Sequence, residues 1–332
     1  MTRSPIIFID GEAGTTGLGI RRRLASLPIT LHTIPPQHRK DPIARKEAMI
    51  QADLVVLCLP DDASREAEAM VATMGKNAPR LLDASTAFRT DSKWVYGFPE
   101  LIPTQTQAIA TAARVSNPGC YPTGAIGLLR PLINAKILPT DYPLCINAIS
   151  GYSGGGRSMI EAHERDGGPA FILYGLTLDH KHIPEICQHA RLTRRPLFVP
   201  SVGHFAHGMI VSIPLHLDEL NGAVSAEDLY TVLKNHYNTP PNKEHDKRHS
   251  TEYATGQEQK QEQKMVHVIP PEKTLLDNIL SAETLAGSDF MELRVHSNPH
   301  HKHVVLTARL DNLGKGASGA ALQNIKLMLG FN

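Results

Sequence analysis

The chain has 332 residues, of which 41% are hydrophobic and 20% charged, a composition typical of a soluble globular protein of about two domains. This length excludes a small domain that depends on disulfides, and no apolar run approaches the roughly 18 residues that a membrane span needs. The formal net charge of +1 provides no global field to hold nucleic acid or an anionic membrane. Any anion-binding site must therefore be local.

The first hundred residues alternate short apolar runs with longer helical patterns. The apolar runs predict strands at 5–9, 29–34, 52–59 and 80–84. Helical periodicity predicts helices at 18–27 and 63–74. This alternation is typical of a doubly wound parallel sheet, so we expect an α/β mononucleotide- or dinucleotide-binding domain.

The pattern changes from about Cys120 onward. One predicted helix at 124–134 is followed by longer strand-like runs at 143–149, 197–199 and 209–215, which indicate an α+β second domain. A polar segment at 238–264 is predicted to be an exposed loop or insertion. A glycine-rich turn at 311–319 opens a last predicted helix.

Neither the N-terminus nor the cysteines indicate export or metal binding. The apolar run at 6–9 is too short for a signal peptide, so we expect a cytoplasmic protein. The four cysteines contain no C-x-x-C pair, which predicts reduced thiols. The histidine clusters at 180–182 and 300–303 lack the spacing of familiar zinc motifs, so no metal site is predicted.

A glycine-rich turn, GEAGTTG at 11–17, directly follows the first predicted strand. Glycines there let backbone N–H groups approach a pyrophosphate, which the helix N-terminus stabilises. A tight turn that needs glycine for positive φ is the alternative. The position after the first strand favours a dinucleotide cofactor. The expected contacts are Gly11, Ala13, Gly14, Thr15, Thr16 and Gly17.

The residues after the second predicted strand favour NADP(H) over NAD(H). NAD-selective sites place an Asp or Glu about 20 residues after the glycine turn, to bind the ribose hydroxyls. Here no acid follows that strand before Asp41, and Arg39 and Lys40 stand where a 2′-phosphate would lie. The alternative is that these two cations form an ordinary solvated pair.

The segment SNPGCYPTG at 116–124 places Cys120 at or just before a predicted helix start. Free N–H groups and the helix dipole there favour a thiolate. Cys58, Cys145 and Cys187 lie within apolar runs and fit inert core thiols, which is also the alternative for Cys120. A nucleophilic thiol beside a nicotinamide site predicts covalent acyl or aldehyde chemistry.

The motif NPGCYPT at 117–123 resembles the active-site motif of the N-acetyl-gamma-glutamyl-phosphate reductases, relatives of the aspartate-semialdehyde dehydrogenases. The resemblance to this family extends over nearly the whole chain, through further motifs in the same order. These are the 11–17 turn, DASTAFR at 83–89, GYSGGGR at 151–157, HKHIPEI at 180–186 and DNLGKG at 311–316. Residues 203–209 and 213–215 resemble the shorter of the family's two forms.

This resemblance implies a fold and an assembly. The expected fold is a Rossmann-like NADP-binding domain, formed by 1–119 with 310–332, and an α+β catalytic domain of the semialdehyde dehydrogenase type at 120–309. The expected assembly is a homodimer or homotetramer that acts on a small molecule. Neither a nucleic acid nor a membrane partner is expected.

The resemblance further implies a reaction. N-acetyl-gamma-glutamyl phosphate would be reduced with NADPH to N-acetyl-L-glutamate 5-semialdehyde and phosphate, in arginine biosynthesis, through a thioester on Cys120. His182 would be the general acid/base, with His204 as a second candidate. Glu185 would orient His182 or, alternatively, act only as an acid at a helix N-terminus.

The departing phosphate needs cations or N–H donors. Arg89 and Arg157 are candidates because a guanidinium can grip phosphate at two points. Asn312 is expected near the nicotinamide. At 207–209 the sequence HGM replaces the Arg-Gly-Ile of the longer form, so the substrate carboxylate contact there is not carried over. The expected substrate and phosphate residues are Arg89, Asn117, Ser153, Arg157 and His204.

Two other functions remain open from the sequence. An aspartate-semialdehyde dehydrogenase, or another phosphorylating aldehyde dehydrogenase, would share the thiol and the cofactor and differ only in the acyl chain. A nucleotide-sensing or metal-binding protein would have no turnover. That second alternative gives no reason for a thiol at a helix start.

Overall fold

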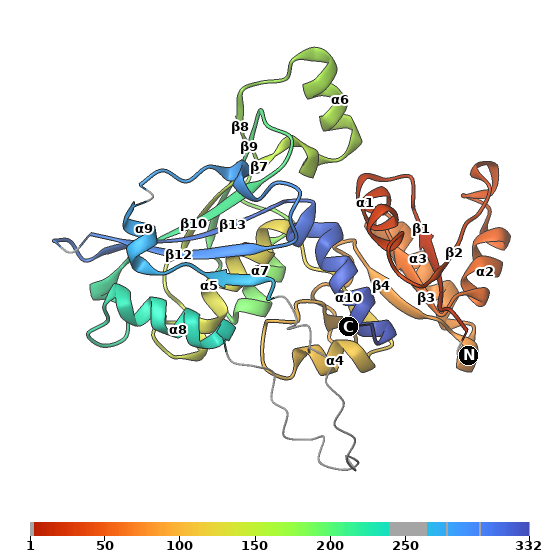
Figure 1. The fold of residues 1–332 in the computed structure, drawn as a ribbon, viewed down its shortest axis with the longest axis horizontal. Helices are drawn as coiled ribbons and strands as arrows, with labels where there is room; N and C mark the ends of the chain where they lie inside the picture. Colours follow the sequence, from red (N-terminus) through yellow and green to blue (C-terminus); the bar gives the residue numbers. More distant parts are fainter. Residues whose placement is uncertain (1–2, 239–263, 277, 299, 332) are drawn as a thin grey trace, which may run out of the picture.

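The computed structural model describes residues 3–238, 264–276, 278–298 and 300–331. The polar segment predicted at 238–264 lies, except for its two end residues, outside this description. Two sheets lie at opposite ends of the molecule, and the last helix runs between them (Figure 1). Among the described residues, no helix is long and apolar enough to cross a membrane.

The first sheet has parallel strands in the order β2-β1-β3-β4-β6-β5. Strand β3 is buried along its whole length, as expected of a parallel strand covered on both faces. The strand order changes direction between β1 and β3, where doubly wound sheets bind ligands at the carboxyl ends of their strands. The strands are β1 (Ile6–Asp10), β2 (Thr30–His32), β3 (Leu54–Leu57), β4 (Arg80–Asp83), β5 (Val95–Tyr96) and β6 (Arg114–Ser116).

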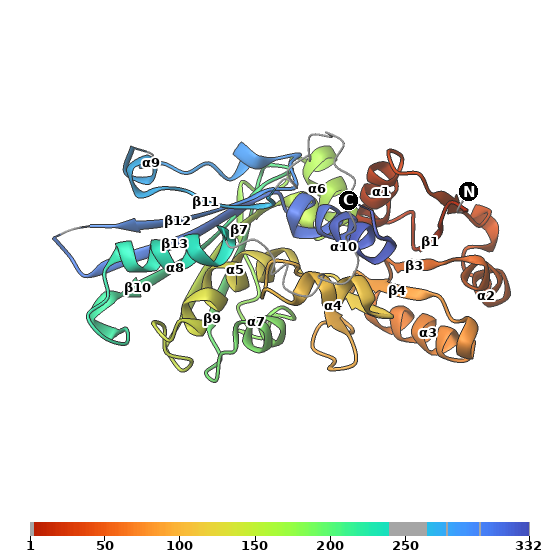
Figure 2. The ribbon, with the colours of Figure 1, turned by 60° about the horizontal axis from the view of Figure 1, so that its bottom comes forward.

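Helices cover both faces of this sheet because its side chains alternate between two cores. Ile7 and Ile9 of β1 join a cluster with α1, α4 and α10, whereas Phe8 joins a cluster with α2 and α3. Helix α10 therefore packs on the first sheet although it ends the chain (Figure 2). These helices are α1 (Thr15–Leu24), α2 (Pro42–Gln51), α3 (Asp61–Ala72), α4 (Gln105–Thr111) and α10 (Gly319–Leu329).

The second sheet is mixed and has the order β11-β12-β13-β10-β7-β9-β8. Its apolar face packs against α5 (Cys120–Asn134), α7 (Ile183–Ala190) and α8 (Ala226–Asn238) (Figure 2). Helix α6 (Arg157–Asp166) projects away from it (Figure 1), and α9 is Pro271–Leu276. The strands are β7 (Cys145–Gly151), β8 (Phe171–Leu173), β9 (Leu197–Gly203), β10 (Met209–His216), β11 (Val266–Val268), β12 (Met291–Ser297) and β13 (His303–Leu310).

The helix predicted at 124–134 begins earlier, at Cys120, because Gly119 is its extended N-cap and Pro122 fits its first turn. The strand pair β12 and β13 and the helices α2 and α8 were not predicted. Helix α2 does carry a start signal, since the Asp41 side chain caps it by accepting the N–H of Ile43, with Pro42 at the first position.

Candidate active site

A cleft of about 530 Å³ opens at the carboxyl ends of the first sheet's strands. One wall consists of the turns that follow β1, β3, β4 and β6, which meet there because parallel strands end at a common edge. The other wall comes from the turns after β7 and β13 and before α7. Of the site residues predicted from the sequence, the cleft brings together Thr15, Thr16, Arg89, Asn117, Cys120, Ser153, His182 and Asn312.

Cys120 is the first residue of α5 and is half-buried. The turn after β13 closes over it, since a Cβ added to Gly316 would lie 2.9 Å from the Cys120 Cβ. The chain thus returns from the second sheet to cover the thiol. A glycine at 316 permits this close approach.

The His182 imidazole lies against the residue that precedes Cys120. A Cβ on Gly119 would lie 2.7 Å from His182 Nε2 and 2.6 Å from Arg89 Nη1, so these side chains leave room only for glycine. Burial, followed by the positive charge of Arg89, holds the pKa of His182 well below its usual range. The buried Nδ1 of His182 has no hydrogen-bond partner among the residues that the structure describes. His182 is therefore a neutral imidazole that can accept a proton.

The structure corrects the expectation that Cys120 is a ready thiolate. Burial raises the pKa of the Cys120 thiol, and this outweighs the backbone N–H of Tyr121 and the Arg89 charge, which lower it. The helix start contributes in the expected direction, but desolvation of the thiolate is larger. A neutral thiol needs a base, and the neutral imidazole of His182, which lines the same cleft, can serve as one.

Glu185 is buried and holds the turn that carries Cys120. Its Oε1 accepts the Gly119 N–H at 2.8 Å and the Tyr96 hydroxyl at 2.7 Å, while Oε2 accepts from Arg89 Nη1 at 3.1 Å. None of these three hydrogen bonds joins Glu185 to His182. The orienting role expected from the sequence therefore applies to the Gly119 turn and to Arg89.

Arg89 lines the cleft, but its charge is already compensated by Glu185. Its Nε donates to the Asn117 carbonyl at 2.9 Å and its Nη2 to the Ala84 carbonyl at 3.2 Å. Arg89 thus joins the ends of β4 and β6 to α7. Three of its five N–H donors are used in this way.

Two buried asparagines fix the returning turn. Asn117 donates to the Ala317 carbonyl at 3.1 Å. Asn312 donates to Ser153 Oγ at 2.8 Å and accepts the Gly208 N–H at 2.9 Å. Because Ser153 and Asn312 both line the cleft, this bond fixes two wall residues relative to each other.

Arg157 and His204 lie away from the cleft. Arg157 begins α6 with an exposed side chain that pairs with Glu161 at 2.8 Å. The exposed His204 ring meets the His163 ring, with 2.9 Å between their Nδ1 atoms. Gly154 and Gly156, which precede Arg157, line the cleft, but the Arg157 side chain on α6 is exposed and pairs with Glu161.

The glycine turn fits a dinucleotide pyrophosphate. Packing explains Gly11, with φ +89° and a Cβ position 2.3 Å from the Cys58 carbonyl oxygen, and Gly17, whose Cβ would lie 2.6 Å from the Gly11 oxygen. Packing does not explain Gly14, which is exposed and whose Cβ would meet only the Gly11 oxygen, at 3.5 Å. Gly14 caps α1 without a side chain, so the first N–H groups of α1 face an approaching anion unobstructed.

The adenosine end of this turn contains an acid that sequence reasoning missed. Glu12 is buried and accepts from Arg39 Nη2 at 2.6 Å and from Arg21 Nη1 at 3.0 Å, while Lys40 is exposed. Two guanidinium groups on one carboxylate leave a net positive charge, which fits a 2′-phosphate. The signal available in the sequence was Glu12 inside the glycine turn, with Arg21 in the following helix and Arg39 in the segment after the second strand.

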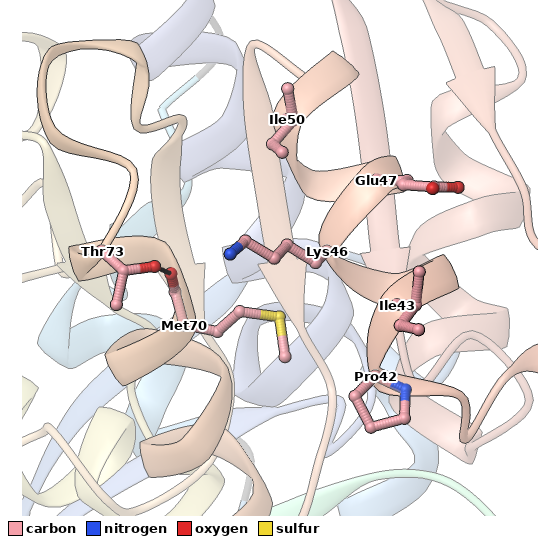
Figure 3. Close-up of a pocket in the computed structure, with 7 residues that line it drawn as sticks. All are labelled: Pro42, Ile43, Lys46, Glu47, Ile50, Met70 and Thr73. Carbon is pink, nitrogen blue, oxygen red and sulfur yellow. Dashed lines mark hydrogen bonds between the residues drawn. The ribbon is translucent and has the colours of Figure 1, made fainter.

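A second hollow of about 480 Å³ lies on the outer surface between α2 and α3 (Figure 3). None of the predicted site residues lines it. It is lined by Pro42, Ile43, Lys46, Glu47, Ile50, Met70 and Thr73.

Family comparisons match both halves of the chain. The NAD binding domain of semialdehyde dehydrogenases matches residues 21–109, and their dimerisation domain matches residues 120–245. Among solved structures, aspartate semialdehyde dehydrogenase II of Vibrio cholerae, complexed with ASA, has a TM-score of 0.67 at 15% identity over 99% of both chains. The aspartate semialdehyde dehydrogenase of Candida albicans, with NADP, has a TM-score of 0.63 at 11% identity over 98% of this chain and 99% of its own. At these identities the two structures show the fold alone.

Two relatives match almost end to end. The N-acetyl-gamma-glutamyl-phosphate reductase 2 of Pseudomonas putida is 50% identical over 331 residues, which are 98% of this chain and 97% of the relative. The N-acetyl-gamma-glutamyl-phosphate reductase of Burkholderia ambifaria is 46% identical over 330 residues, 98% of this chain and 96% of the relative. Identity of this extent means that the chain belongs to the N-acetyl-gamma-glutamyl-phosphate reductase family of semialdehyde dehydrogenases.

Proposed function

We propose that this chain reduces N-acetyl-gamma-glutamyl phosphate with NADPH to N-acetyl-L-glutamate 5-semialdehyde and phosphate, a step of arginine biosynthesis. The observation that carries the proposal is the position of Cys120, at the start of α5 in a cleft that also contains the start of α1. The relatives named for this substrate share 46% and 50% identity, whereas the two aspartate semialdehyde dehydrogenase structures share 15% and 11%. This difference favours the acetylated substrate.

The first chemical step transfers the acyl group to sulfur. His182 takes the thiol proton, the Cys120 sulfur forms a bond to the acyl carbon, and the bond from that carbon to the phosphate oxygen breaks. Phosphate leaves with the bonding electrons and takes up a proton from the solvent. The products of this step are hydrogen phosphate and a thioester beside a protonated imidazole. Glu185 fixes the Gly119 turn, which precedes Cys120 and lies against the His182 imidazole.

The second step converts the thioester to the aldehyde. Bound NADPH supplies a hydride to the thioester carbon. Protonated His182 donates its proton to the resulting oxyanion and then removes it again as the carbon–sulfur bond breaks. The thiolate of Cys120 recovers that proton, so the enzyme ends the cycle with a neutral thiol and a neutral imidazole.

The cofactor contacts follow from the turn geometry. We assign the pyrophosphate to the N–H groups after Gly14 and the 2′-phosphate to the Arg21, Arg39 and Lys40 side. Ser153 and Asn312 are assigned to the part of the cleft next to Cys120.

The assembly and the compartment are part of the same proposal. The dimerisation domain supports an oligomer, and we infer a homodimer or homotetramer. The face of the second sheet opposite α5 exposes Asn147, Pro214 and Val305 to solvent. We infer that this face packs against a second copy of the chain. The four free cysteines are consistent with a reducing cytoplasm.

The test measures NADP⁺ reduction with N-acetylglutamate semialdehyde, with and without phosphate, beside aspartate semialdehyde. Phosphate-dependent turnover of the acetylated substrate alone is the expected result, and Cys120→Ser is expected to abolish it. Turnover of aspartate semialdehyde instead would assign the sister reaction. Silence with both substrates would leave a binding protein without turnover.

A further inference from the structure

We propose that Lys181 binds the phosphoryl group that leaves during acyl transfer and, in the reverse direction, the attacking inorganic phosphate. The proposal rests on the proposed function and names the residue that meets its charged leaving group. Lys181 lies in the turn before α7, next to His182, and both line the cleft.

The charged residues that line the cleft indicate which cation can bind a phosphate. Arg89 and Lys181 are the two permanent cations among the described residues that line it, and the carboxylates there are Asp61 and Asp62. Arg89 is neutralised by Glu185 at 3.1 Å. Of the two cations, Lys181 is the one that forms no ion pair among the described residues, although Asp61 and Asp62 share the cleft with it. Its ammonium group is therefore the charge that an anionic group of the substrate can bind.

The Lys181 side chain is exposed, and the ion pairs found among the described residues do not include it. Its charge is nevertheless felt across the cleft. Burial raises the pKa of Asp61, but the hydrogen bonds from Thr86 and then the charge of Lys181 bring it below its usual range. The charge of Lys181 also lowers the pKa of His182, after burial, Arg89 and His180. Its charge therefore acts on groups of both walls of the cleft.

The position of Lys181 next to His182 favours binding of the phosphate over binding of the substrate carboxylate. The leaving oxygen is bonded to the same carbon that Cys120 attacks, so the phosphate must lie beside the thiol and His182 during transfer. The substrate carboxylate is several bonds further away. Lys181 directly precedes His182, and a flexible ammonium can follow the phosphate as it departs.

The two arginines assigned to phosphate from the sequence do not meet this need. Arg157 is turned outward onto Glu161. Arg89 lines the cleft and has two N–H donors that no described residue uses, but its charge is neutralised by Glu185. Donors from Arg89 and charge from Lys181 would together hold the phosphate.

The experiment compares Lys181→Met, Lys181→Arg and the wild-type chain in NADP⁺ reduction, with phosphate and N-acetylglutamate semialdehyde varied independently. Lys181→Met is expected to raise the KM for phosphate about 10- to 100-fold, the range for loss of one charged hydrogen bond. The KM values for the semialdehyde and for NADP⁺ should stay within about twofold. Lys181→Arg should restore most of the phosphate affinity. Lys93→Met removes an exposed lysine elsewhere and should change nothing.

A second readout needs no turnover. Inorganic phosphate should protect Cys120 of the wild-type chain from iodoacetamide, and this protection should be lost in Lys181→Met. A phosphate KM within twofold of wild type would overturn the proposal, as would a raised semialdehyde KM with phosphate unaffected, which would assign Lys181 to the carboxylate. Failure of the wild-type chain to turn over the semialdehyde would instead refute the proposed function.

Discussion

The Glu185 carboxylate accepts the backbone N–H of Gly119 at 2.8 Å, although the two residues are 66 positions apart. The same carboxylate holds the Tyr96 hydroxyl and the Arg89 guanidinium. The start of α5, and with it Cys120, is thus fixed by a buried acid on α7. The thiol and the imidazole both depend on this one anchor, because His182 directly precedes α7.

Glu185→Gln should destabilise the fold and reduce turnover. The substitution keeps the shape of the side chain but leaves the buried Arg89 charge without its partner, which costs about 3 kcal/mol in free energy of unfolding. Denaturant unfolding measures this change. Glu161→Gln is the matched control, since Glu161 pairs with the exposed Arg157 and its loss should have little effect. Equal effects of the two substitutions would contradict the anchoring role.

His182→Asn should slow turnover about 10²- to 10⁴-fold near neutral pH, the usual contribution of a positioned acid/base. The pKa of His182 is lowered, so the wild-type imidazole stays an unprotonated base through the neutral range. The pKa of Cys120 is raised, so the thiolate becomes abundant only above the ordinary thiol range. The ratio of wild-type to variant rates should therefore shrink as the pH rises above about 9, where hydroxide can deprotonate the thiol without His182.

His204→Asn decides between the two histidines that the sequence left open. His204 contacts His163 outside the cleft, so its loss should change turnover by less than about twofold. The measurement compares the pH–rate profiles of His182→Asn and His204→Asn with the same substrates. A large loss in His204→Asn with normal activity in His182→Asn would reverse the assignment.

Local signals were sufficient for the parts of the site formed by consecutive residues. Pro118, Gly119 and Pro122 placed Cys120 at a helix start, and the glycine turn was recognisable after the first strand. Both features depend on φ restrictions and free N–H groups within a few residues.

Contacts between distant segments could not be predicted in this way. The partners of Glu185 lie 66 to 96 positions away, and nothing in the sequence near Glu185 identifies Tyr96 as one of them. Arg157 was misplaced because a glycine-rich turn does not specify the direction of the following helix. The pKa of Cys120 was misjudged because a helix start is visible in sequence, whereas the burial of the thiol is a property of the fold.

Gly14→Ala should weaken cofactor binding without weakening the fold. The added methyl group meets the Gly11 oxygen at an ordinary 3.5 Å but occupies the approach to the N–H groups of α1. We expect the KM for NADPH to rise about tenfold, the equivalent of one hydrogen bond, with the melting temperature unchanged. Gly17→Ala, whose Cβ would lie 2.6 Å from the Gly11 oxygen, should instead lower the melting temperature. Unchanged NADPH affinity in Gly14→Ala would place the pyrophosphate elsewhere.

Arg39→Ala should reduce the preference for NADPH over NADH. Arg39 is held at the end of the glycine turn by Glu12 at 2.6 Å, where a 2′-phosphate would meet its guanidinium. Loss of a charged hydrogen bond predicts a rise in the KM for NADPH of about 10- to 100-fold, whereas the KM for NADH, which lacks the phosphate, should change little. Arg194→Ala, at an exposed position in the second domain, controls for the loss of a surface charge. An equal rise in both KM values would mean that Arg39 supports the turn through Glu12 and does not read the phosphate.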